Sequence, residues 1–287
     1  MATGDFHLHS TASDGVRSPT WVVETAAANG VRILALTDHD TTEGLAEARA
    51  AAEHAGVQLI SGIELSVDLD GVDAHLLGFG FDLAHAPLQA YLSEQREGRV
   101  GRMKRIVRTL ASHGLAIDAE RVLEIAGAAS VGRPHVARAL VEAGHIASVA
   151  DAFDQWLGDG KPGHVTRDRL SPAEAIALVH EAAGVAFAAH PIFLGEPYED
   201  PVRALAALGL DGLEAHYKHY DADTVAAHCA LATELGLATS GGSDYHGLGN
   251  PDDREIGEIP FPDGAVDAFV AFLESRAVPG LALAGAA

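Results

Sequence analysis

The chain has 287 residues, 48% of them hydrophobic, so it can bury a sizeable core as one α/β domain or as a domain with an insertion. Its 41 acidic and 19 basic residues give a formal net charge of -22, which argues against a general nucleic-acid-binding surface. One cysteine, Cys229, excludes an intramolecular disulfide and is expected to be a small buried residue. There is no signal-peptide pattern and no apolar run of roughly 18 residues, so we expect a cytoplasmic protein without a membrane span.

Short apolar runs alternate with alanine-rich helical stretches, a pattern typical of βα units around a parallel sheet. Ser18 before Pro19 predicts a helix N-cap, and Ser171 with Glu174 predicts a capping box. The predicted strands are residues 5–9, 31–37, 57–64, 75–81, 184–190, 211–216 and 237–244.

Between residues 86 and 169 the strand pattern stops, and helical segments are predicted at 118–128, 134–144 and 148–157. We therefore expect a catalytic barrel formed by residues 1–85 and 170–287, with residues 86–169 as a helical insertion. Because the loops after barrel strands build active sites and their lids, the insertion is expected to cover the site and to recognise the substrate.

The first predicted strand contains Asp5, His7 and His9 at alternate positions. Side chains alternate across a strand, so both imidazoles face one side and can bind one cation. Such a pair is weak evidence by itself. Asp14 follows in a polar turn, where an ordinary turn residue is the alternative interpretation.

Ionisable residues also end the second and third predicted strands. Asp40 is predicted to cap the next helix together with Glu43, which leaves Asp38 and His39 for other roles. Glu64 ends the third strand, where a solvated strand end is the alternative.

The later strands add four more ionisable residues. His75 begins an apolar run instead of ending one, so a half-buried strand histidine is its alternative. His190 ends so apolar a strand that its imidazole must be paired or ligating. Asp244 and His246 lie two positions apart in a glycine-rich turn. The shared position at strand ends predicts a metal cluster, which would also offset part of the negative charge.

These residues form motifs that span nearly the whole chain, and the insertion adds two more. They are His7-Leu8-His9-Ser10 with Asp14, Thr37-Asp38-His39-Asp40, His190-Pro191, Ser243-Asp244-Tyr245-His246, Arg133-Pro134-His135 and Gly160-Lys161-Pro162-Gly163. The chain resembles the PHP (polymerase and histidinol phosphatase) metallophosphoesterases, and within them the nucleoside 3′,5′-bisphosphate phosphatases and 5′ to 3′ exoribonucleases. The resemblance implies a distorted (β/α)7 barrel with a helical insertion.

The resemblance also implies two to three divalent cations, with Glu64 bridging two of them. The expected ligand sets are His7, His9, Glu64 and Asp244; Glu64, His75 and His190; and Asp14, His39 and His246. Some relatives have histidine at the position of Asp14, so the third site here is expected to be richer in oxygen. This slightly favours Mn²⁺ or Fe²⁺ over Zn²⁺.

Mixed imidazole and carboxylate ligation suits Mn²⁺, Zn²⁺ or Fe²⁺, and adjacent cations lower the pKa of a shared water, which predicts a hydroxide nucleophile. Arg133 is expected to hold a phosphate bidentately and Lys161 to act as a point charge. His135 is expected to bind phosphate or to protonate the leaving oxygen. A helix-start charge and a loop residue are the alternatives for Arg133 and Lys161.

Arg17, Glu214, Tyr217 and His219 are expected to face the mouth of the site, and Arg17, Tyr217 and His219 are expected to contact the substrate. A polar rim is the alternative for His216 and His219. A predicted helix carries Arg96, Arg99, Arg102, Lys104, Arg105 and Arg108. Spacings of three place several of these along one side, where they would guide a short RNA 5′ end; a solvated helix face is the alternative.

The predicted function is metal-dependent hydrolysis of nucleotide phosphate esters, namely the 3′-phosphate of nucleoside 3′,5′-bisphosphates, the 5′ ends of short RNA, or both, without extended duplex binding. A histidinol-phosphate phosphatase or another small-molecule phosphomonoesterase ranks second, because Arg133 and Lys161 favour two phosphates. An amidohydrolase fits Asp14 and the closing Asp244-x-His246 poorly. A non-catalytic metal-binding module is disfavoured because every ligand position is filled. No feature of the sequence specifies an oligomeric state.

Overall fold

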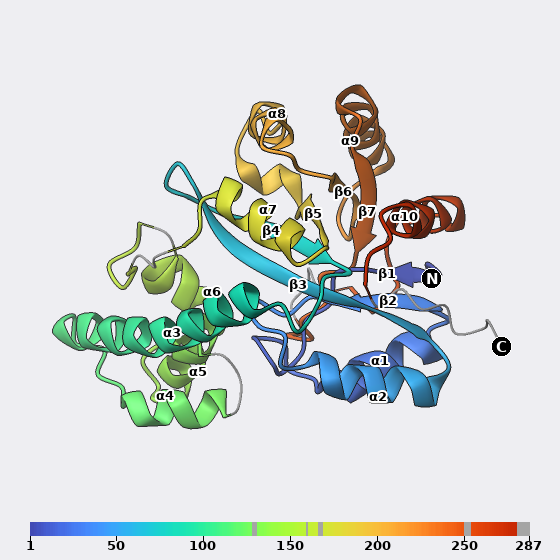
Figure 1. The fold of residues 1–287 in the computed structure, drawn as a ribbon. Helices are drawn as coiled ribbons and strands as arrows, with labels where there is room; N and C mark the ends of the chain where they lie inside the picture. The colour runs from blue at the N-terminus through green and yellow to red at the C-terminus, as the bar shows by residue number, and fades with distance from the viewer. Residues whose placement is uncertain (128–130, 159, 166–168, 250–253, 280–287) are drawn as a thin grey trace. The chain divides into compact units, whose positions relative to one another are not determined.

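The computed structural model describes residues 1–127, 131–158, 160–165, 169–249 and 254–279. The chain divides into two compact units, one formed by Met1–Gln89 with Arg169–Ala287 and the other by Ala90–Asp168 (Figure 1). These borders lie close to positions 86 and 169, where the sequence places the ends of the insertion. None of the described helices is long and apolar enough to cross a membrane.

A seven-stranded sheet, whose strands follow one another in sequence order, forms the centre of the first unit. The strands are β1 (Gly4–Asp5), β2 (Ile33–Leu36), β3 (Gln58–Leu69), β4 (Val72–Phe79), β5 (Val185–Ala188), β6 (Gly212–Tyr217) and β7 (Ala238–Gly242). The two edges meet where Phe6 N–H donates to the Gly241 carbonyl at 3.0 Å and where Leu8 bridges to Tyr245. The predicted seven-stranded α/β barrel is therefore confirmed, as a nearly closed one.

Helices cover the outside of the barrel (Figure 1). They are α1 (Pro19–Ala28), α2 (Leu45–Ala55), α7 (Pro172–Glu181), α8 (Glu199–Ala207), α9 (Ala222–Leu235) and α10 (Asp263–Ser275). Both predicted caps are confirmed, because the Ser18 side chain accepts from Trp21 N–H and Ser171 forms a reciprocal capping box with Glu174.

The expectation of a parallel sheet does not hold for β4, which runs antiparallel to both β3 and β5. A hairpin joins β3 to β4 through Asp70 (φ 52°) and Gly71 (φ 87°), and glycine adopts such a φ without strain. Because β4 is reversed, His75 near its start lies at the edge where β5 ends, and its carbonyl accepts from Ala189 N–H at 3.2 Å. His75 therefore begins an apolar run and still lies at the same edge as the strand ends, because its strand is reversed.

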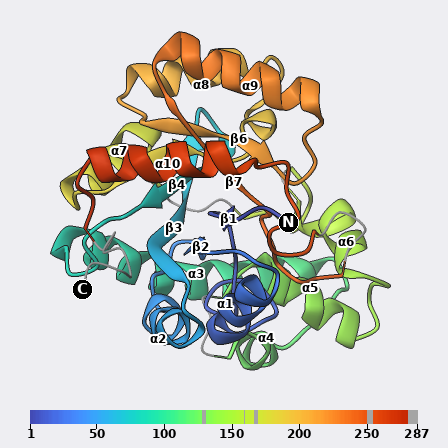
Figure 2. The same cartoon turned by 90° about the vertical axis from the view of Figure 1, so that its right-hand side faces the viewer.

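The apolar core fills the end of the barrel opposite to the edge where His75 and the end of β5 lie. Phe269 of α10 packs against Phe6, Phe79 and Phe187, with ring centroids 4.5, 5.2 and 5.5 Å away. The same cluster includes Ile33, the first residue of β2. Figure 2 shows α10 lying across the strands. The aromatic core therefore leaves the other end of the barrel to the polar residues.

The second unit has its own apolar core, which includes Ile106, Leu110, Val122 and Leu140. Its helical elements are the main part of α3 (Ala86–Ser112), α4 (Ala119–Ala126), α5 (Arg133–Glu142), α6 (Val149–Ala152) and the π-helical turn η1 (Phe153–Leu157). The three predicted helical segments are confirmed, except that residue 128 lies outside the described residues. That this unit covers the site stays a prediction.

Candidate metal centre

Glu64 stands in the middle of a buried group of histidines at the ends of the barrel strands. Its Oε2 lies 3.2 Å from Nε2 of His7, 3.1 Å from Nε2 of His9 and 3.2 Å from Nδ1 of His39, while Oε1 lies 2.9 Å from Nδ1 of His75 and 3.2 Å from Nε2 of His190. Glu64 does not end its strand, because β3 continues to Leu69, where the hairpin begins. Its side chain is buried instead of solvated.

Asp244 supplies a second carboxylate to the same group. Its Oδ1 lies 3.4 Å from Nε2 of His7 and 3.2 Å from Nε2 of His9. The other oxygen accepts a 2.7 Å hydrogen bond from the Tyr217 hydroxyl and lies 3.1 Å from Nζ of Lys218. These two partners orient the Asp244 carboxylate toward the histidines.

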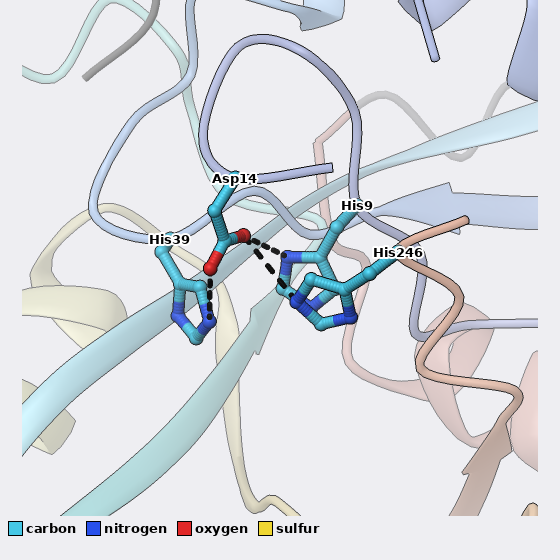
Figure 3. Close-up of side chains that lie close together, drawn as sticks. All are labelled: His9, Asp14, His39 and His246. Carbon is cyan, nitrogen blue, oxygen red and sulfur yellow. Dashed lines mark ion pairs between the residues drawn. The ribbon is translucent and has the colours of Figure 1, made fainter. Parts of the chain in front are cut away.

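Asp14 lies between imidazoles from three segments that are distant in sequence, as Figure 3 shows. Its Oδ1 is 3.3 Å from Nε2 of His246 and 3.8 Å from Nδ1 of His9, and its Oδ2 is 3.9 Å from Nε2 of His39. The rings of His9 and His246 stack with centroids 4.0 Å apart. A second carboxylate–imidazole group thus adjoins the Glu64 group.

These donors fit divalent cations. Three groups each have all their ligand atoms within 4.8 Å of one another, namely His7, His9, Glu64 and Asp244; His9, Asp14, His39 and His246; and His39, Glu64 and His75. Buried Nε2 of His7, both ring nitrogens of His9 and Oε2 of Glu64 make no hydrogen bond. Buried polar atoms are normally paired, so a cation is the partner that their chemistry calls for.

The structure brings together all the residues expected to bind metal. The first expected set is grouped as anticipated, and His9 joins the expected set of Asp14, His39 and His246. His39 is grouped with Glu64 and His75, where His190 was expected. His190 nevertheless lies against the same Glu64 oxygen as His75.

Burial and charge oppose each other at these residues. Burial alone would lower the pKa of His7, but Glu214, Glu64 and Asp244 raise it well above its ordinary value. Burial would raise the pKa of Glu64, yet His39, His75 and His7 hold it well below its usual range. The buried Glu64 carboxylate thus favours its ionised form, which is the form that binds a cation, while the carboxylates around His7 favour positive charge at that position.

The local chain path differs from the predicted first strand, because β1 ends at Asp5. The buried Asp5 carboxylate accepts from the backbone N–H of His7, Ser243 and Gly257, at 3.4, 2.9 and 2.8 Å. These bonds satisfy backbone N–H groups beyond the end of β1, where the regular strand pairing stops. His7 and His9 still face the same cluster, although they follow the strand instead of belonging to it.

The prediction that Asp40 caps a helix with Glu43 is wrong. Asp40 has φ 50°, and its carboxylate accepts from the N–H and hydroxyl of Ser66 at 2.9 Å each. Helix α2 begins later, after Gly44, without a side-chain cap. The neighbouring carboxylate of Asp38 accepts from Ser10 and Ser13, so it fixes the turn that carries Asp14.

Glu214 has a role that the sequence did not reveal. Its Oε1 lies 3.0 Å from Nδ1 of His7, and its Oε2 accepts from the backbone N–H of His190 at 2.7 Å. His190 has the unusual backbone angles φ 28° and ψ 64°, which the Glu214 bond helps to hold. Glu214 is thus a buried support for two of the histidines instead of a residue at the mouth.

His216 is not part of a polar rim. A bulge between Glu214 and His216 breaks the alternation of β6, so two residues expected on one face point to different surroundings. The buried His216 ring lies on Phe261, and its Nδ1 is 2.8 Å from the Pro260 carbonyl. Lys218 follows β6 and contacts Asp244. The sequence pattern did not indicate this contact, because the direction of the Lys218 side chain depends on the fold of the strand before it.

The expected substrate residues of the first unit differ in exposure. Tyr217 is buried with its hydroxyl on Asp244. His219 is exposed, and the exposed Arg17 has its guanidinium over the Trp21 ring, 4.8 Å from its centroid.

In the second unit, Nη1 of Arg133 donates to the Leu157 carbonyl at 3.2 Å, and Nζ of Lys161 lies 3.8 Å from Asp154. His135 is buried, and its Nδ1 accepts from Gly132 N–H at 3.0 Å. The basic residues of α3 do not form one exposed row. Arg102 is buried and donates to the Val165 carbonyl at 2.7 Å, whereas Arg105 and Arg108 are exposed.

A barrel with such a cluster at its strand ends defines a metal-dependent hydrolase. Residues 5–158 match the model of the PHP domain. The chain is 37% identical to a 5′-3′ exoribonuclease of Haemophilus influenzae, over 84% of this chain and 89% of the relative. It is 35% identical to a 3′,5′-nucleoside bisphosphate phosphatase of Chromobacterium violaceum, over 90% of this chain and 91% of the relative.

A solved structure from Chromobacterium violaceum, described as an amidohydrolase with bound sulfate and no metal, superimposes with a TM-score of 0.85. The two chains are 33% identical, and the match covers 96% of this chain and 97% of that one. The chain belongs to the PHP domain family, and it is a metal-dependent phosphoesterase.

Proposed function

We propose that this phosphoesterase hydrolyses phosphate esters of nucleotides, namely the 3′-phosphate of nucleoside 3′,5′-bisphosphates, the 5′ ends of short RNA, or both. The carboxylate–imidazole cluster around Glu64 supports the chemistry. The two relatives named for nucleoside bisphosphates and for RNA support the choice of substrate.

Two to three divalent ions would be held by the cluster, with Glu64 shared between two of them. The proposed ligands are His7, His9, Asp14, His39, Glu64, His75, His190, Asp244 and His246. Because Asp14 adds a carboxylate among three imidazoles, Mn²⁺ is the proposed ion, ahead of Fe²⁺ and Zn²⁺. Ions bound here would supply an activated water at neutral pH and positive charge for the phosphoryl oxygens.

The protein's own residues would orient these ligands and add charge. Glu214 fixes the ring of His7, and Tyr217 and Lys218 fix the Asp244 carboxylate. Lys218 is only 10% exposed, so its ammonium also adds a positive charge beside the cluster that solvent screens little.

Three residues of the second unit are proposed to act on the substrate. Arg133 would bind a phosphate bidentately and Lys161 would act as a point charge. The Nδ1 of His135 accepts Gly132 N–H, which places the proton of the neutral ring on Nε2. That nitrogen would donate to a phosphate or to the leaving oxygen. Arg17 and His219 are proposed as further substrate contacts.

A substrate panel tests the proposal. Phosphate release from adenosine 3′,5′-bisphosphate, histidinol phosphate and a 5′-phosphorylated oligoribonucleotide is measured with Mn²⁺, beside a panel of amides. We expect the two nucleotide substrates to be preferred by kcat/KM. A preference for histidinol phosphate would reassign the substrate, and a preference for amides would favour the chemistry suggested by the description of the structural relative.

A further inference from the structure

Phe193 is a large apolar side chain that leaves 60% of its surface exposed. It belongs to the short 3-10 helix η2 (Pro191–Leu194), which directly follows His190. Single exposed apolar residues are common on proteins, so exposure alone does not indicate a site. The contacts of the Phe193 ring with the candidate centre are what indicate a function.

The Phe193 ring lies against two side chains of the candidate centre. Its centroid is 5.3 Å from that of His190 and 6.1 Å from that of Tyr217, both in edge-to-face arrangements. The His190 ring faces Glu64, and the Tyr217 hydroxyl is bonded to Asp244. The exposed ring therefore packs directly against one proposed metal ligand, His190, and lies one side chain, Tyr217, away from another, Asp244.

The backbone beneath this ring is fixed. Phe193 N–H donates to the His190 carbonyl at 3.0 Å, and Ile192 N–H donates to the Tyr220 hydroxyl at 3.3 Å. Leu194 is buried and anchors the end of η2. An exposed apolar ring on a fixed backbone gives a preorganised surface, which loses little conformational freedom when a flat ligand stacks on it.

We propose that Phe193 is the platform on which the nucleobase of the substrate stacks while the phosphate is bound at the Glu64 cluster. This inference rests on the proposed nucleotide function and adds the residue that distinguishes a nucleotide from another phosphate ester. Every base has a π-face, so such a platform accepts different bases. It therefore suits an enzyme that acts on nucleotides without reading their sequence.

The experiment compares adenosine 3′,5′-bisphosphate with methyl riboside 3,5-bisphosphate, which lacks the base. Stacking of one base is worth about 1–3 kcal/mol, or roughly 5- to 150-fold. In Phe193→Ala, we expect the ratio of the two kcat/KM values to fall by about this factor, chiefly through KM. Phe193→Trp should restore the ratio. Leu208→Ala, which changes another exposed apolar residue at the end of α8, should leave the ratio unchanged.

Equal losses on both substrates in Phe193→Ala, or no loss on either, would overturn the proposal. Calorimetric binding of adenosine 5′-monophosphate to the Mn²⁺-loaded variants separates this failure from failure of the proposed function. If the wild type hydrolyses no phosphate ester but binds the nucleotide more weakly after Phe193→Ala, the platform stands and the proposed reaction does not. If the affinity does not depend on Phe193, the platform is contradicted directly.

Discussion

The Oε1 of Glu214 lies 3.0 Å from Nδ1 of His7, with both side chains completely buried. The second Glu214 oxygen accepts from His190 N–H. When Nε2 of His7 binds a cation, Nδ1 carries the ring proton and donates to Glu214, so in Glu214→Gln the NH₂ group faces a donor, His7 Nδ1–H or His190 N–H, whichever way the amide turns. Because such supports of ligating histidines are worth about 10- to 100-fold, we expect the Mn²⁺ affinity to fall by that factor.

Titration calorimetry and metal analysis after desalting measure this effect. Glu53→Gln, which changes an exposed carboxylate on α2, is the matched control and should retain the affinity of the wild type. A Glu214→Gln protein with the wild-type affinity would show that Glu214 does not position His7.

Gly242 is packed directly against His7. A Cβ at position 242 would lie 2.1 Å from the His7 Cβ and 2.6 Å from its backbone nitrogen. Gly242→Ala must therefore displace His7, and we expect the free energy of unfolding to fall by about 1–3 kcal/mol and metal occupancy to decrease. Denaturant unfolding and metal analysis measure the two effects.

Gly98→Ala is the control for that substitution. A Cβ there meets no atom within 4 Å, and position 98 lies inside α3. Because alanine favours a helix interior, this change should stabilise the protein by up to about 1 kcal/mol. If Gly242→Ala behaved like Gly98→Ala, the packing of His7 on Gly242 would be contradicted.

Much of the candidate centre could be predicted from sequence because its residues follow apolar runs. His190 and Asp244 come two residues after a strand and His246 four residues after one, and parallel strands end at one edge of a sheet. His75 did not follow this rule, since the reversal of β4 depends on the Asp70-Gly71 hairpin and on pairing with β5. A local pattern contains no information about that pairing.

The supporting residues could not be predicted because their roles depend on contacts between distant segments. Glu214 reaches His7 and His190 only once β6 lies beside β5 and the β6 bulge turns His216 away. Asp40 has the local pattern of a helix cap, yet its carboxylate accepts a hydrogen bond from the hydroxyl of Ser66 on β3. Here a tertiary hydrogen bond replaces the local one.

Two buried histidines outside the cluster predict a contribution to stability that is lost at acid pH. Burial lowers the pKa of His216 and of His228 below the ordinary value of 6.5. Below about pH 6.5 these two residues therefore bind more protons in the unfolded chain than in the folded one, and their contribution to the free energy of unfolding falls as the pH decreases. Above that pH the stability from these neutral rings is fully present.

Urea unfolding between pH 7.5 and about pH 5 measures this dependence. The decrease should be smaller in His228→Asn than in the wild type, relative to each protein's stability at pH 7.5. His54→Asn removes an exposed histidine on α2 and should retain the wild-type slope. Identical slopes in wild type and His228→Asn would show that His228 is not kept neutral by burial.

The exposed basic residues of α3 are predicted to favour an RNA substrate. Because Arg102 is buried, the informative variant is Arg105→Glu with Arg108→Glu. An oligoribonucleotide carries more phosphates than adenosine 3′,5′-bisphosphate, so reversing these charges should weaken its binding more. We therefore expect the larger increase in KM for the oligoribonucleotide. The difference should shrink at higher salt concentration.

Arg32→Glu with Arg49→Glu makes the same change of charge at exposed positions of the first unit and is the control. It should affect both KM values equally. If the α3 variant also affected both equally, α3 would be only a solvated helix face.

The central claim is that the carboxylate of Glu64 organises a metal centre that hydrolyses nucleotide phosphate esters. The most direct measurement is phosphate release from adenosine 3′,5′-bisphosphate by chelator-treated protein, before and after addition of Mn²⁺, for the wild type and for Glu64→Gln. We predict that chelation abolishes release, that Mn²⁺ restores it in the wild type, and that Glu64→Gln stays inactive while remaining folded. Full turnover by the chelated protein, or by Glu64→Gln with Mn²⁺, would contradict the claim.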